Sequence, residues 1–114
     1  MSPQTIFEKI KHLNEIGQEF WSARELFRVL EYNSWDKFLN VISKAKEACK
    51  NSGQVETDHF PRVGKMVEIG SNTQRDIGDL HLTRHACYLI IQNADPSKEI
   101  IALGQTYFAV QTRK

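Results

Sequence analysis

Apolar side chains recur every three or four positions over most of this chain, and the pattern is clearest between Trp21 and Lys50. Ser22 followed by Glu25 fits a capping box at the start of a short amphipathic helix. Ser34 opens a second helix, which should run to about Lys50. The apolar positions of this second helix are Trp35, Phe38, Leu39, Ile42, Ala45 and Cys49. A short capped helix, a turn and a longer amphipathic helix predict a helix-turn-helix-like pair.

The amino-terminal segment also favours a helix. Ser2 and Pro3 fit an N-cap followed by proline at the first helical position, and Gly17 would end the segment. Apolar residues keep helical spacing in between, at Ile6, Phe7, Ile10 and Leu13. A strand over residues 7–13 is the less favoured alternative.

Residues 66–69 and 79–82 are short and alternating, as expected for the two arms of a small β-hairpin. Residues 70–78 between them are polar and should form a flexible loop. Residues 54–61 also form a loop, with Phe60 docked on the core. Together with the helices, the hairpin predicts an α+β fold that is mainly α.

Two further helices should complete the fold. Thr83 caps a helix that continues to about Asn93, and its nearly continuous apolar run predicts burial on most sides. Asp95 and Pro96 read as the N-cap and first residue of a last helix, on which Gly104 would permit close helix approach. The predicted core residues are Trp21, Leu26, Phe27, Leu30, Trp35, Phe38, Ile42, Tyr88, Leu89, Ile90, Leu103 and Phe108.

Composition limits the classes of function. The 114 residues contain 15 Lys and Arg against 14 Asp and Glu, so the net charge is +1 and any nucleic-acid contact must come from a local patch. No apolar run approaches the roughly 20 residues of a membrane span, and no signal peptide is visible, so we expect a cytoplasmic protein. Cys49 and Cys87 lie in apolar helical stretches and should be reduced, buried and separate.

No catalytic or metal-binding arrangement stands out. His81, His85 and Cys87 are close in sequence, but a strand-to-helix junction between them spoils simple ligand spacing and no fourth ligand is evident. The chain has no glycine-rich phosphate loop, nucleophile elbow or Cys-x-x-Cys pair. We therefore expect no catalytic residues, no metal and no cofactor.

Two groups of polar residues are candidates for nucleic-acid binding. Lys37, Asn40 and Lys44 form one stripe of the second helix, where they could meet phosphates and base edges. The polar loop adds a second group of hydrogen-bond donors, which are Asn72, Gln74 and Arg75. We expect the helix and the loop, acting as a wing, to flank one binding face. A solvated helix face and a plain connecting loop are the alternatives.

Several sequence blocks carry a family resemblance, and they cover most of the chain in order. They are Trp21 to Leu26, Lys44 to Cys49, Ile69 to Asn72, Ala86 to Leu89 and Gly104 to Arg113. These blocks resemble bacterial regulators of the DNA-damage response that are similar to the Bro-N group of phage antirepressors and viral proteins. The resemblance implies a single Bro-N-like domain over residues 1–114, the amino-terminal part of a longer protein.

The same resemblance implies a DNA-associated regulatory module without enzymatic activity. The expected partner is DNA, bound through the helix-turn-helix-like element. The alternative is a protein-interaction module that acts on a recombinase or repressor, which the near-zero net charge would suit. An exposed apolar patch would favour that alternative.

Overall fold

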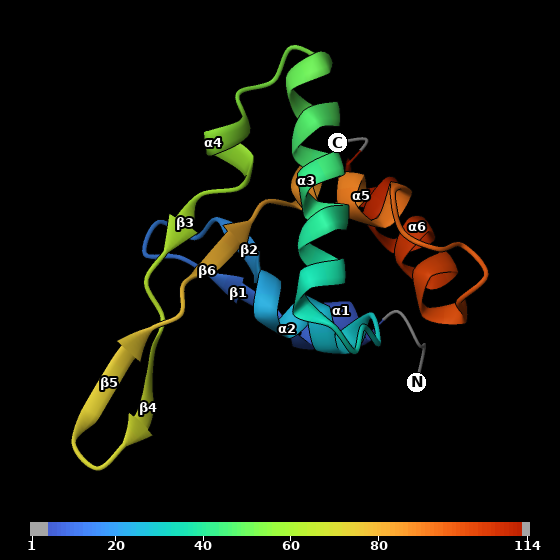
Figure 1. The fold of residues 1–114 in the computed structure, drawn as a ribbon. Helices are drawn as coiled ribbons and strands as arrows, with labels where there is room; N and C mark the ends of the chain where they lie inside the picture. The colour runs from blue at the N-terminus through green and yellow to red at the C-terminus, as the bar shows by residue number, and fades with distance from the viewer. Residues whose placement is uncertain (1–4, 113–114) are drawn as a thin grey trace.

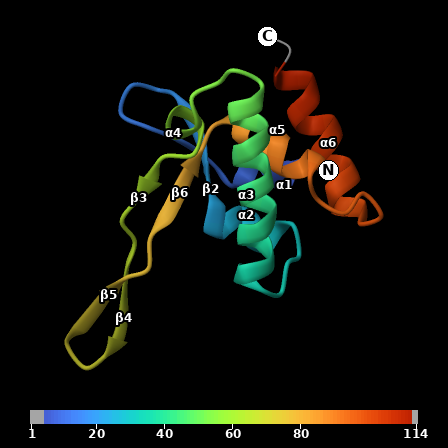
Figure 2. The same ribbon diagram turned by 45° about the horizontal axis from the view of Figure 1, so that its top comes forward.

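A computed structural model describes residues 5–112 and confirms the α+β fold (Figure 1). The helices are α1 Thr5–Lys9, α2 Ala23–Val29, α3 Trp35–Asn51, α4 Glu56–His59, α5 Arg84–Gln92 and α6 Glu99–Thr112. The strands are β1 Lys11–Leu13, β2 Glu19–Ser22, β3 Arg62–Val63, β4 Met66–Gly70, β5 Thr73–Asp76 and β6 Asp79–Leu82. Helix α5 lies between α3 and α6, and the β4–β5 hairpin projects away from the rest of the molecule (Figures 1 and 2).

Four strands form one antiparallel sheet in the order β1-β2-β6-β3. Strand β6 is central: Trp21 of β2 pairs with its Leu82, and Arg62 of β3 pairs with its Leu80. The sheet therefore joins the amino-terminal third of the chain to residues about 60 positions later. Strands β4 and β5 pair only with each other, as a separate two-stranded sheet.

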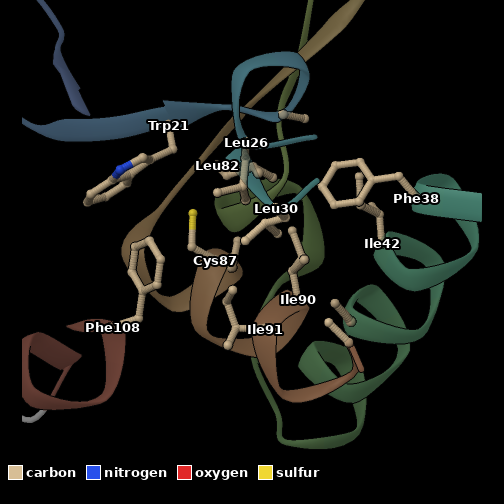
Figure 3. Close-up of a cluster of buried hydrophobic side chains, with 14 of the residues drawn as sticks. Trp21, Leu26, Leu30, Phe38, Ile42, Leu82, Cys87, Ile90, Ile91 and Phe108 are labelled. Carbon is tan, nitrogen blue, oxygen red and sulfur yellow. The ribbon is translucent and has the colours of Figure 1, made fainter. Parts of the chain in front are cut away.

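The core lies where β2, β6, α2, α3 and α5 meet (Figure 3). Cys87, Ile90 and Ile91 of α5 stand at its centre, which confirms that this helix is buried on most sides. Phe60 is also buried, as predicted, but the segment 54–61 is not all loop, because it contains helix α4. Of the predicted core residues, those that are only half-buried are Phe27, Trp35, Tyr88, Leu89 and Leu103.

The three helix caps read from the sequence are present. The side-chain oxygens of Ser22, Ser34 and Thr83 each accept a hydrogen bond from the backbone N–H three residues later, at 3.3, 3.3 and 3.1 Å. The capping box at Ser22 is only half formed, because the Glu25 carboxylate bonds His12 Nε2 at 2.6 Å.

The prediction of one helix up to Gly17 is wrong. Helix α1 ends at Lys9 and the chain turns into strand β1, whose His12 pairs with Phe20 of β2. The alternative strand over 7–13 was correct only for its last three residues. Pairing with distant β6 decides this segment, and helical spacing in the local sequence cannot reveal it. The predicted cap at Ser2 and Pro3 lies outside the described residues.

The hairpin exists, but its predicted second arm and its flexible loop are wrong. Strand β4 pairs with residues 73–76, which had been assigned to the loop, and the turn is only residues 71–72. Residues 79–82 are a strand, as expected, but they form β6 in the main sheet. Strand β5 reads as a loop because both of its faces meet water, so it shows no apolar alternation.

The last helix begins at Glu99, later than predicted. The Asp95 carboxylate accepts hydrogen bonds from the backbone N–H and the hydroxyl of Ser97, at 2.9 and 2.8 Å, which makes a turn rather than a helix start. The close approach at Gly104 is confirmed, because an added Cβ would lie 2.8 Å from Ile91 Cδ1 and 3.2 Å from Phe7 Cζ.

Candidate nucleic-acid interface

The polar stripe of α3 is exposed. Lys37, Asn40 and Lys44 all face solvent, on the side of the helix away from its buried residues. The cap at Ser34 and the core contacts of Phe38 and Ile42 fix the helix on the body, so the stripe is held on a rigid element. Such a stripe can donate hydrogen bonds to phosphates and to base edges.

The second candidate group lies on the β4–β5 hairpin, which we call the ribbon and define as residues 66–76. Asn72 occupies the turn with a positive φ of 62°, and Gln74 and Arg75 belong to β5. Gln74 pairs with Glu68 and Arg75 with Val67, so these two side chains lie on opposite faces of the ribbon. The ribbon is thus a regular two-sided element rather than a loose loop.

The root of the ribbon, which is formed by Lys65 and residues 76–78, is anchored by Asp76. Its Oδ1 accepts the backbone N–H groups of Lys65 and Gly78, both at 2.9 Å, and its Oδ2 lies 3.6 Å from the Arg62 guanidinium. The two backbone N–H groups lower the pKa of Asp76, and the Arg62 charge adds to this effect. Gly78 has a φ of +70°, and an added Cβ there would lie 2.6 Å from Arg62.

Arg24 ties this root to the helices. Its guanidinium donates to the backbone oxygens of Gly78 and Ile77 at 2.6 and 2.7 Å, and its Cζ lies 4.4 Å from the centre of the Trp35 ring. One side chain of α2 therefore holds the ribbon root and contacts the first residue of α3. In the sequence, Arg24 is one of three charged residues of α2, and nothing local distinguishes it.

A groove of about 670 Å³ separates α3 from the ribbon root. Its α3 side is Trp35, Leu39, Ile42, Ser43 and Lys46. The opposite side is formed mainly by α4, β3 and the start of β6, and includes Arg62 and Ile77. Lys46 lies 4.0 Å from Glu56 across this groove, so its charge is partly neutralised.

The structure keeps the α3 group on one stripe, but it divides the ribbon group between the turn and the two faces of the ribbon, and it separates the two groups from each other. At 3.6 residues per turn, the stripe of Lys37, Asn40 and Lys44 lies roughly 140° around α3 from the flank that lines the groove. The ribbon root lies across the groove from α3. The exposed side of α3 is therefore bordered by the ribbon along one edge and by the polar stripe along the other. Asn40 lies nearest the middle of that side.

A second exposed surface surrounds the turn between β1 and β2. Leu13 and Ile16 are 65% and 77% exposed, and they line a shallow hollow with Phe20 and His81. The Phe20 ring is stacked between His12 and His81, with centroid distances of 5.2 and 4.1 Å. These five residues form what we call the β1–β2 apolar patch, which the sequence analysis did not identify.

The buried thiols are suited to packing rather than chemistry. Cys49 and Cys87 are free and buried, and burial raises the pKa of each thiol. Within residues 5–112, no three His, Cys, Asp or Glu side chains are arranged to hold a metal ion. In the same part of the chain, no helix is long and apolar enough to cross a bilayer.

The fold and these surfaces define an α+β domain in which a capped helix and a projecting ribbon frame one exposed side. Residues 9–109 match the BRO family, N-terminal domain (Bro-N), and the chain belongs to this family. It is similar to DNA damage-inducible protein D of Escherichia coli (strain K12), with 53% identity over 108 residues. The match covers 95% of this chain and 39% of that relative's length. No solved structure matches the chain. These findings confirm the family resemblance read from the sequence blocks.

Proposed function

We propose that this domain is a regulatory DNA-binding module that acts in the response to DNA damage. The name of the similar Escherichia coli protein states that it is inducible by DNA damage, and this supports the physiological part of the proposal. The DNA-binding part rests on one structural observation: the exposed hydrogen-bond donors of α3 and of the ribbon stand on the two margins of the exposed side of α3.

The arrangement suits a helix placed along the major groove. A major groove about 12 Å wide admits a helix and has a phosphate backbone on either side. Lys37 and Lys44 would contact one backbone, and Arg75 of the ribbon would reach toward the other. Asn40, nearer the middle of the exposed side, would contact a base edge. Asn72 in the turn and Gln74 on the other face of the ribbon would add further donors.

Binding to a mixed-sequence duplex across a salt series tests this proposal. If phosphates are contacted, log affinity should fall linearly with log salt, with a slope of about −0.9 per neutralised phosphate. Lys37→Ala, Lys44→Ala and Arg75→Ala should each weaken binding on all sequences and reduce the slope by about one. Asn40→Ala should mainly change sequence preference, by ~1–3 kcal/mol at one base pair.

Lys9→Ala supplies the matched control, because Lys9 is an exposed lysine on α1 rather than on α3 or the ribbon. Its salt slope should equal that of the parent. Failure of the parent chain to bind duplex DNA at low salt would contradict the proposal. A folded Lys37, Lys44 and Arg75 triple alanine variant that binds like the parent would show that the face is wrongly placed.

The β1–β2 apolar patch favours a second candidate function, protein interaction. Singly exposed apolar residues are ordinary, but Leu13, Ile16 and Phe20 together line one hollow. A repressor or recombinase is the class of partner expected in a DNA-damage regulator. Leu13→Ser with Ile16→Ser should abolish co-purification of such a partner and leave the DNA salt slope unchanged. An unchanged complex would exclude this surface.

A further inference from the structure

We propose that the ribbon binds the DNA minor groove and inserts Ile69 into a base step as a wedge that bends the duplex. This inference rests on the proposed DNA binding and adds to it a groove, a residue and a mechanical effect. It follows from the support, the side-chain composition and the irregular pairing of the ribbon.

The ribbon receives little support from the body. Its only strand pairing within residues 5–112 is between β4 and β5, and the body contacts it at the root, where Arg24 and Arg62 bind residues 76–78. Both views show it projecting clear of the helices (Figures 1 and 2). An isolated two-stranded hairpin is marginally stable in water. Such an element gains order when it binds a surface.

Two large apolar side chains are exposed on this element. Met66 is 57% exposed and Ile69 is 58% exposed, so neither contributes much to a core. Ile69 lies directly beside the turn, next to Gly70 and Ser71. An exposed aliphatic side chain directly beside the turn is poorly explained by the folding of this domain.

The strand pairing is irregular at Ile69. Glu68 pairs with Gln74, but the next pair is Gly70 with Thr73, so Ile69 has no partner and the register shifts there. A β-bulge of this kind re-aims a side chain and bends the strand. Met66 and Glu68 follow the regular alternation of side chains and lie on one face of the ribbon. The bulge removes Ile69 from this alternation.

The rest of the tip has the composition of a minor-groove ligand. Proteins that bind this groove use Arg, Lys, Asn and Gln, and many insert an apolar wedge between base steps. From Ile69 to Arg75 the chain supplies Asn72, Gln74 and Arg75 and contains no acidic residue. Arg75 is the one charge between Glu68 and Asp76, and with Asn72 and Gln74 it offers hydrogen-bond donors to a polyanion. A second ribbon would bring the same donors, and this favours DNA as the occupant.

The test measures affinity and bending together. The parent chain and its variants are added to a duplex of about 30 base pairs with a central TA step and a fluorophore at each end, because pyrimidine–purine steps kink easily. Anisotropy gives affinity, and energy transfer between the ends gives the bend. The parent should shorten the end-to-end distance, as expected for a kink within the usual range of about 20–90°.

Ile69→Ala should abolish most of the bend and weaken binding about tenfold, whereas Ile69→Leu should retain both. Val55→Ala is the matched control, because Val55 is 58% exposed, lies outside α3, the ribbon and the β1–β2 apolar patch, and should behave like the parent. Melting temperatures of all three variants should match the parent, since neither Ile69 nor Val55 is buried.

Each outcome of this test either supports or contradicts the proposed Ile69 wedge. An Ile69→Ala variant that binds and bends like the parent overturns the wedge while the DNA-binding proposal stands. A parent that binds no duplex overturns both. Sedimentation that shows a parent dimer converted to monomer by Ile69→Ala overturns the wedge in favour of contact between ribbons of two copies. Loss of the bend in Ile69→Ala, with rescue in Ile69→Leu, supports it.

Discussion

Arg84 in the body and Arg75 in the ribbon show two uses of the same side chain. Arg84 is 11% exposed, donates to both carboxylate oxygens of Glu19 at 2.6 and 2.8 Å, and lies 4.9 Å from the Trp21 ring centre. Arg75 is exposed on β5. The body uses its cation to join α5 to β2, whereas the ribbon leaves its cation available to a ligand. The cation that stabilises the fold and the cation that is proposed to contact DNA thus lie in different parts of the chain.

The largest effect should come from removing Arg84. Arg84→Ala leaves Glu19 with only the longer 4.0 Å contact to Lys11 and removes a guanidinium packed on aromatic rings, so the free energy of unfolding should fall by about 2–4 kcal/mol. Urea denaturation measures this change. Arg75→Ala should stay within about 0.5 kcal/mol of the parent. Equal losses at the two positions would remove the distinction between body and ribbon.

Gly104 in the body and Gly70 in the ribbon allow the packing of the two regions to be compared. Gly104→Val should cost about 1–3 kcal/mol, because Ile91 and Phe7 already fill the space beside the Gly104 Cα. Gly70 in the ribbon has no atom within 4 Å of an added Cβ, so Gly70→Val should leave stability within about 0.5 kcal/mol of the parent. Thermal melts of both variants check the prediction. A tolerated Gly104→Val would mean that the contact between α5 and α6 is loosely packed.

The ribbon root should respond to Arg24. Arg24→Ala removes two charge-assisted hydrogen bonds to the backbone oxygens of Ile77 and Gly78, so the free energy of unfolding should fall by about 1–2 kcal/mol. Hydrogen exchange should also show lost protection of the Ile77 amide, which donates to the Lys65 oxygen. Arg28→Ala, an exposed arginine on the same helix, is the control and should change neither quantity.

The smallest expected effect is a difference in pH dependence between the body, through Glu19, and the ribbon root, through Asp76. Hydrogen bonds from Arg84 lower the pKa of Glu19 below its ordinary 4.5, and the N–H groups of Lys65 and Gly78 lower the pKa of Asp76 below its ordinary 3.8. A lowered folded-state pKa means that the stabilisation is present above these ordinary values and is lost as pH falls through the folded values.

Protonation of Glu19 should therefore lower the global unfolding free energy, whereas protonation of exposed Asp76 should loosen only the ribbon root. Carbon NMR titration of the two carboxyl groups gives the pKa values, and urea melts and root-amide protection give the consequences. Glu19→Gln and Asp76→Asn should each remove one response and leave the other. A global response to Asp76 would show that the root is part of the body's cooperative unit.

The accuracy of the sequence analysis followed the range of the interactions. The caps at Ser22, Ser34 and Thr83 use backbone groups three residues away, so they could be read locally. Strands β1 and β2 were missed because β2 pairs with β6 about 60 residues later. Strand β5 was missed because both of its faces are exposed to solvent, so its sequence shows no alternation of apolar and polar residues.

The candidate site divides in the same way. The stripe of Lys37, Asn40 and Lys44 follows from helical spacing, and its exposure was predictable. Its position relative to the ribbon was not, because that depends on which flank of α3 faces the groove. Arg24 donates hydrogen bonds to carbonyl oxygens that lie more than 50 residues away in the sequence. The local sequence of its helix therefore cannot predict that it anchors the ribbon root.

The anchoring of the ribbon also bears on how such a domain can diversify. Its direction is set by Arg24, Asp76 and Gly78, all of which lie outside the tip. Residues 69–74 can therefore be exchanged with little effect on folding, so that new recognition is reached by changes which selection for stability does not oppose. If the ribbon binds DNA as proposed, its tip is for that reason the position at which a different DNA preference can be engineered onto this body.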